Sequence, residues 1–145
     1  MRRHWLLGIL ALATVAGAGY VDWASAEDAH PGGEEWKAPA RAAKKKNTVP
    51  ADDKSSAAGK VMYQQECLAC HGETGRGDGP SAHDLEKTPG DLSKPVMWEQ
   101  SDGALFWKIT EGRKPMPTYA ERFTDEQRWS IVNYVRTLAP KPQGK

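Results

Sequence analysis

The stretch "CLACHG", residues 67–72, contains both cysteines of this 145-residue chain, three positions apart and followed at once by a histidine. This spacing places the two thiols about one helical turn apart. Cys-x-x-Cys-His is the attachment pattern of c-type haem, in which each thiol adds to a vinyl group and the imidazole lies beneath the iron. The pattern therefore predicts one covalently bound haem c, with Cys67 and Cys70 as the anchors and His71 as the proximal iron ligand.

Other uses of paired cysteines stay open at this point. A reactive dithiol of thioredoxin type shares the Cys-x-x-Cys spacing, but it expects a βαβ setting that this sequence lacks. A Cys67–Cys70 disulfide is allowed in an exported protein. Zinc needs four ligands, and the chain after residue 26 offers these two cysteines, His30, His71 and His83 without a second paired cluster. Haem attachment is the favoured interpretation.

The N-terminal residues 1–26 have the layout of a secretory signal peptide. Two arginines precede an apolar run over residues 6–21, and Ala-Ser-Ala then predicts cleavage after Ala26. The apolar run is shorter than the roughly 20 residues of a membrane span, and Gly17 and Gly19 interrupt it. We therefore expect export to the periplasm and a soluble protein after cleavage.

Residues 27–54 differ in composition from the rest of the chain. They are rich in proline, alanine and charge, contain Trp36 as their single aromatic residue, and show no sustained apolar periodicity. The basic run at residues 44–46 could dock on an acidic partner or a membrane surface, but runs of this length are usually solvated. We interpret this segment as an extended or disordered arm that acts as a linker.

Residues 55–140 predict a compact all-α domain, and residues 141–145 are left as a C-terminal tail. A serine cap begins the first helix, Gly112 is expected to cap the second, and Thr124 with Gln127 forms a capping box for the last. The expected helices cover about residues 55–69, 101–112 and 124–138. Small domains bury a thin core, so we predict a fold of three to five helices wrapped around one haem.

With these elements, the chain resembles the class I cytochromes c over residues 55–138. In that family a glycine eight positions before the first cysteine and an aromatic residue four before it pack against the C-terminal helix. Here they correspond to Gly59 and Tyr63, and their expected partners on the last helix are Ile131 and Tyr134. A glycine suits this place because it lets two helix backbones approach closely.

The resemblance implies two further haem-binding residues. The family's proline whose carbonyl orients the ligand histidine matches Pro80 in "GDGP", and its distal methionine matches Met116 in "KPMP". Prolines on both sides of Met116 restrict the backbone of its loop. Met97 is the second choice for the distal ligand and His83 the third, and we expect them to be a core residue and a loop residue.

A histidine and a methionine together would saturate the iron and raise its reduction potential. We therefore predict an electron-transfer protein rather than an enzyme, a periplasmic carrier that shuttles electrons between redox protein partners. One alternative is a haem-bearing subunit of a larger membrane-associated respiratory or dehydrogenase complex. Another is a haem enzyme or gas sensor, which requires that Met116 not bind the iron.

The surroundings of the haem are also expected from the sequence. The net charge of +1 gives no support to a nucleic-acid partner. Four loop cations should surround the haem edge and favour an acidic redox partner: Lys87, Lys94, Arg113 and Lys114. Acidic residues in the same loops weaken this expectation. Some of the remaining aromatic residues should wall the haem, from the set Trp98, Phe106, Trp107, Tyr119 and Trp129.

Overall fold

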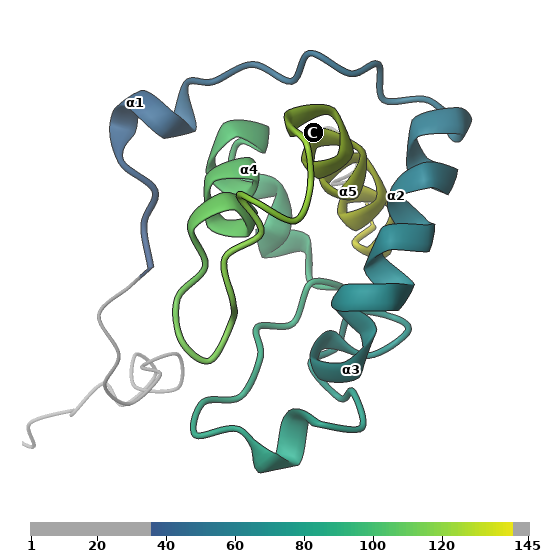
Figure 1. Cartoon of the computed structure of the whole chain (residues 1–145), viewed down its shortest axis with the longest axis vertical. Coiled ribbons are helices and arrows are strands. Elements are labelled where there is room, and N and C mark those ends of the chain that lie inside the picture. The colour runs from purple at the N-terminus through teal and green to yellow at the C-terminus, as the bar shows by residue number, and fades with distance from the viewer. Residues whose placement is uncertain (1–35, 141–145) are drawn as a thin grey trace, which may run out of the picture. The chain divides into compact units, whose positions relative to one another are not determined.

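The computed structural model in Figure 1 describes residues 36–140, and these residues form a helical domain without a β-strand. The expected signal peptide, the arm up to residue 35 and the C-terminal tail lie outside the described residues. The all-α prediction is confirmed. The α-helices are α1 (Ala40–Ala43), α2 (Asp53–Glu66), α3 (Leu68–His71), α4 (Asp102–Glu111) and α5 (Asp125–Leu138), with 3-10 helices η1 (Ala82–Asp84) and η2 (Pro95–Glu99).

Side-chain caps explain where the long helices begin. Thr124 and Gln127 form the expected capping box of α5, and the Ser101 hydroxyl accepts from the Ala104 N–H at the start of α4. Helix α2 begins earlier than expected because Asp52, and not a serine, is its cap. The Asp52 carboxylate accepts from the Ser55 N–H at 2.8 Å. Helix α2 also stops at Glu66, so the Cys-x-x-Cys-His segment forms a separate turn, α3.

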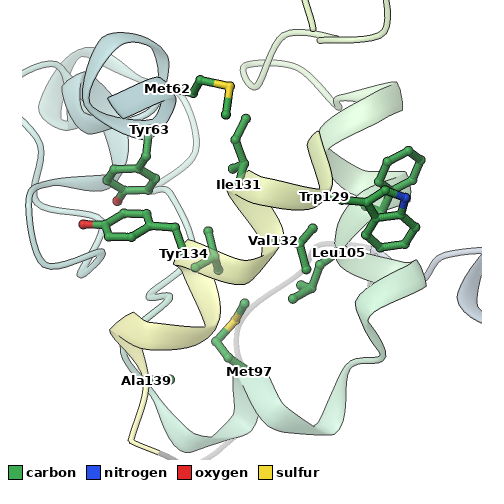
Figure 2. Packing of buried hydrophobic residues seen from close by; sticks show 11 residues of the cluster. Met62, Tyr63, Met97, Leu105, Trp129, Ile131, Val132, Tyr134 and Ala139 are labelled. Carbon is green, nitrogen blue, oxygen red and sulfur yellow. The ribbon is translucent and has the colours of Figure 1, made fainter. Parts of the chain in front are cut away.

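The crossing of α2 and α5 depends on Gly59. A Cβ atom at this position would lie 2.0 Å from the Ser130 carbonyl oxygen, so the backbones meet where only glycine fits. One turn along, the Tyr63 and Tyr134 rings pack edge to face with 5.1 Å between centroids, as Figure 2 shows. Ile131 is fully buried beside them. The expected contacts of the first and last helices are confirmed.

The rest of the core lies between α4 and α5. Phe106 and Trp129 stack with 4.1 Å between their centroids, and Leu105 and Val132 pack near them (Figure 2). Met97 from η2 joins this core and is only 7% exposed. Among residues 36–140, no helix combines the length and apolar character that crossing a bilayer requires.

The described part of the arm packs on the domain. In Figure 1 the chain after α1 runs past α4 and α5 before it reaches α2. The Ser101 hydroxyl donates to the Ala43 carbonyl at 2.6 Å, and a Cβ on Gly103 would lie 2.5 Å from the carbonyl oxygens of Ala42 and Lys45. The arm backbone therefore lies directly against the first turn of α4.

A buried polar network holds the arm further along. Asn133 of α5 is 4% exposed, and its amide donates to the Pro50 carbonyl at 3.1 Å and to the Ser55 hydroxyl at 2.9 Å. The Asn47 amide donates in turn to the Asn133 side-chain oxygen at 2.7 Å. Buried polar groups that are satisfied in this way specify one arrangement of the chain. From residue 36 onward the segment is thus an ordered part of the domain rather than a free linker.

The first prediction concerns the helix crossing. In an open helix position Gly→Ala stabilises a protein, but at Gly59 the methyl group must displace the backbone of α5. We expect Gly59→Ala to lower the free energy of unfolding by about 1–3 kcal/mol, measured by urea denaturation. Gln64→Ala, on the exposed side of α2, is the control and should change it by less than about 0.5 kcal/mol. A stabilised Gly59→Ala protein would contradict the close approach.

The second prediction concerns pH. Hydrogen bonds from Lys45 of the arm and from Arg128 hold the pKa of Asp125 below its usual value of 3.8. The stabilisation is therefore present above about pH 3.8 and is lost as the pH falls through the lowered pKa. We expect Asp125→Asn to be less stable than wild type at pH 7, with the difference shrinking toward pH 3.

Because this carboxylate is largely exposed, solvent screening should keep the difference at pH 7 below about 1 kcal/mol. Glu126→Gln removes an equal charge from the same helix turn and is the control for the helix dipole. If Glu126→Gln shows the same pH dependence as Asp125→Asn, the contact between the arm and α5 is not its source.

Candidate functional site

A cavity of about 530 Å³ opens beside α3. Its size falls in the range of about 300–1,000 Å³ that is usual for small-molecule and cofactor pockets. Four segments line it: the end of α2 with α3, the loop of residues 85–90, the loop of residues 113–119, and Trp36 of the arm.

The short helix α3 brings the three predicted attachment residues to this cavity. The Cys67 N–H donates to the Tyr63 carbonyl at 2.8 Å, and the His71 N–H donates to the Cys67 carbonyl at 2.8 Å. The single turn of α3 follows Cys67 directly, and Cys67, Cys70 and His71 all line the same cavity. Directly after this turn, the Tyr63 hydroxyl donates to the Gly72 carbonyl at 2.7 Å and ties it to α2.

The His71 imidazole has the properties of a neutral metal ligand. Burial lowers the pKa of His71, and the nearby backbone of Gly90 opposes this effect only in part. The Nδ1 atom is buried and has no hydrogen-bond partner, which is unusual for a buried polar atom. A neutral imidazole is the form that binds a metal ion, so this residue fits an iron ligand.

The two thiols fit haem attachment better than redox chemistry of their own. Cys67 and Cys70 are not bonded to each other, and burial, helped by the neighbouring Glu66, raises the pKa of Cys67 to about 12. A reactive dithiol requires a lowered thiol pKa. Within residues 36–140, no group of three or more His, Cys, Asp or Glu side chains could hold a metal ion, so the zinc alternative gains no support.

Met116 is the methionine that lines the cavity. Its loop is held by two backbone hydrogen bonds, from the Arg113 N–H to the Met116 carbonyl at 3.0 Å and from the Met116 N–H to the Arg113 carbonyl at 2.9 Å. The Tyr119 hydroxyl, at the end of the same loop, donates to the Glu66 carbonyl at 3.0 Å. This bond connects the methionine loop to the residue that precedes the first cysteine.

The rival ligands lie elsewhere. Met97 is buried in the core, 3.6 Å from the side-chain nitrogen of Gln100. His83 is exposed and lies 3.2 Å from the Asp84 carboxylate. Neither side chain lines the cavity.

Pro80 does not line the cavity either, and it is exposed. Its expected role in orienting His71 stays a prediction. The segment that the structure brings to the cavity is Thr88–Gly90, which the sequence reasoning missed. The available signal was the Pro-Gly pair itself, together with Gly77, where a Cβ would lie 2.4 Å from the Pro89 carbonyl oxygen.

The expectations about the surroundings hold only in part. Of the five aromatic candidates, Tyr119 lines the cavity, whereas the other four pack in the core or on α4. Trp36, whose sequence context predicts a linker, forms an additional aromatic wall. Three of the four loop cations line the cavity, namely Lys87, Arg113 and Lys114, and Lys94 does not.

A small all-α domain that brings two thiols and an imidazole to one cavity has the architecture of a c-type cytochrome. A sequence model of the family described as "Cytochrome C oxidase, cbb3-type, subunit III" matches residues 54–135. Because this match covers more than half of the 145 residues, the chain belongs to this cytochrome c family.

Individual relatives agree with this assignment. The chain is 30% identical over 93 residues to the cbb3-type cytochrome c oxidase subunit CcoP of Azospirillum sp. (strain B510), covering 63% of this chain and 31% of that protein. It is 31% identical over 86 residues to cytochrome c6 of Parathermosynechococcus lividus, covering 57% of this chain and 90% of that protein.

Among solved structures, the chain is similar to a component of the reducing HAO-like protein complex of Kuenenia stuttgartiensis. The TM-score is 0.57 at 31% sequence identity, and the similarity covers 63% of this chain and 46% of the other. The chain thus spans about a third of its CcoP relative and less than half of this structure. The domain itself is a class I, single-haem cytochrome c that carries covalently bound haem c with its iron.

The third prediction concerns attachment. We expect wild-type haem to survive extraction with acidified acetone, whereas Cys67→Ala combined with Cys70→Ala should yield a haem-free and largely unfolded chain, because the cofactor fills the cavity. Far-ultraviolet circular dichroism and the haem absorbance of denaturing gels measure the two effects. Ala69→Ser, between the two cysteines, is the control and should retain the haem. A well-folded double variant that keeps extraction-resistant haem would contradict this assignment.

Proposed function

We propose that this domain is a periplasmic electron carrier in which Cys67 and Cys70 anchor the haem and His71 and Met116 bind the iron. The observation that carries the proposal is that Met116 lines the same cavity as these three residues. Bound haem supplies a one-electron ferric–ferrous couple. The methionine thioether is a soft ligand, which favours the ferrous state and raises the reduction potential.

The chain would hold the two ligands at a constant separation. The hydrogen bond from the Tyr119 hydroxyl to the Glu66 carbonyl links the methionine loop to the end of α2, directly before Cys67. The Thr118 hydroxyl donates to the Thr110 carbonyl at 2.6 Å and fixes the same loop to the end of α4. Two protein ligands would leave no position for a substrate, and a loop held by these bonds would keep the geometry similar in both oxidation states. Both features suit electron transfer and not catalysis.

The rim of the cavity supports an acidic redox protein as partner. Lys87, Arg113 and Lys114 line the cavity, and Lys87 and Lys114 are exposed. Charge complementarity of this kind mainly increases the rate of encounter. The identity of the donor and of the acceptor would follow from the proteins that this rim binds, and nucleic acid is not among the expected partners. Export to the periplasm is supported by the signal-peptide layout of residues 1–26.

A haem-bearing subunit of a membrane-associated redox complex is the second candidate. Similarity to a cbb3-type oxidase subunit and to a component of an HAO-like complex favours it. The two candidates differ in whether the haem-bearing chain is recovered alone or together with membrane components when cells are extracted with a mild detergent. Both candidates use His71 and Met116 as the iron ligands.

The fourth prediction tests the iron ligands. Wild-type ferric protein should show the weak charge-transfer absorption of an iron–thioether bond, and the ferrous protein should resist carbon monoxide near neutral pH. Met116→Ala should abolish the band, admit carbon monoxide and lower the reduction potential. Absorption spectroscopy and a redox titration measure these changes.

Met97→Ala is the matched control. It should keep the band and cost about 2–5 kcal/mol of stability, because it removes a buried side chain. If Met97→Ala and not Met116→Ala removes the band, the ligand assignment is wrong. If wild-type protein binds carbon monoxide readily, the electron-carrier proposal gives way to a haem enzyme or gas sensor.

A further inference from the structure

Trp36 is an arm residue that lines the haem cavity. Its indole ring packs against Trp107 of α4, with 6.2 Å between ring centroids. Two cations lie over the same indole: the Lys108 ammonium at 5.3 Å and the Arg113 guanidinium at 5.1 Å from the ring centroid. Aromatic pairs and cation–π contacts each stabilise a packing arrangement. The ring therefore contacts both the end of α4 and the beginning of the methionine loop.

Arg113 connects this contact to Met116. The backbones of the two residues pair through hydrogen bonds of 3.0 Å and 2.9 Å, so a displacement of Arg113 moves Met116. Arg113, Lys114 and Pro115 are exposed, and an exposed loop opens more easily than a buried one. Packing of Trp36 on Arg113 opposes that opening.

The arm can hold Trp36 against Arg113 because the arm is itself bound to α4 and α5. Only three residues separate Trp36 from α1, whose carbonyl end packs on Gly103 and accepts from Ser101. Beyond α1, Lys45 binds Asp125 and Asn47 binds the buried Asn133. The indole is thus positioned by a segment that is anchored at several points on α4 and α5.

We propose that the arm clamps the methionine loop and that Trp36 is a positioning residue that keeps Met116 on the iron. The inference rests on the proposed ligation of iron by Met116. A thioether is readily displaced when its loop opens, so release of the arm would expose the sixth coordination position to small ligands. The arm would thereby decide whether the centre is closed for electron transfer or open to ligand binding.

Imidazole is the probe for the test, because it binds ferric iron only after the methionine has left. In the full-length holoprotein, we expect Trp36→Ala to increase the rate of imidazole binding by about tenfold, the factor that corresponds to the loss of ~1.4 kcal/mol. Trp36→Phe keeps an aromatic face for Arg113 and should stay close to wild type. Stopped-flow absorption in the thioether band measures the rates.

Trp98→Ala is the matched control for a general loss of stability. Trp98 is also half-buried and packs against an arginine, Arg136, at 4.9 Å, but it does not line the cavity. We expect Trp98→Ala to lower the unfolding free energy and leave the rate of imidazole binding unchanged. Equal acceleration in both variants, or none in Trp36→Ala, would overturn the clamp.

A double-mutant cycle tests whether Trp36 acts through its contact with Arg113. Arg113→Ala alone should accelerate imidazole binding, and the double variant with Trp36→Ala should be slower than the product of the two single effects predicts. Strictly multiplicative effects would overturn the link through Arg113. The result is different if Met116 does not bind the iron, because wild-type protein would then lack the thioether band. If only the clamp proposal is wrong, the wild-type band stays intact.

Discussion

The close approach of α2 and α5 at Gly59 is the constraint on which the rest of the structure depends. Because the Gly59 backbone lies against the Ser130 carbonyl, Tyr63 comes to lie on Tyr134. The hydroxyl of the same Tyr63 donates to the Gly72 carbonyl, directly after α3. The packing of α2 on α5 thus determines the positions of the two thiols and of the His71 imidazole. The helix crossing therefore positions the cysteine and histidine side of the haem site.

The other half of the site comes from a distant part of the chain, and a hydrogen bond connects the two halves. The methionine loop follows α4, and its Tyr119 hydroxyl reaches the carbonyl of Glu66 at the end of α2. A further wall, residues 85–90, belongs to a loop that packs closely on Gly77 at Pro89. Covalent attachment at one wall and coordination at another would join these segments through the cofactor, which explains why so small a domain can tolerate long loops.

The arm lies outside the residues that match the family model. The family match begins at residue 54, so the segment from Trp36 to Asp53 lies outside it. Nevertheless, Asn47 and Gly103 show that this segment packs as closely as the helices do. A segment outside the matched residues therefore forms part of the wall of the cavity, and it contacts the loop that carries the proposed sixth ligand. Regulation of the coordination state would require no change in the shared domain itself.

The sequence by itself determined the features whose chemistry is local. The Cys-x-x-Cys-His spacing and the Thr124 capping box are local patterns, and from them the haem and the last helix could be predicted. The helix crossing at Gly59 and Tyr63 was expected from the resemblance to the class I cytochromes c. Only the tertiary structure decided which residues face the cavity. Trp36 was assigned to a linker because single anchors such as Asn47 leave no periodic pattern, and Thr88–Gly90 was missed in favour of Pro80. In both cases the contact joins residues far apart in the chain, and such contacts depend on how the helices close around the cavity rather than on local spacing.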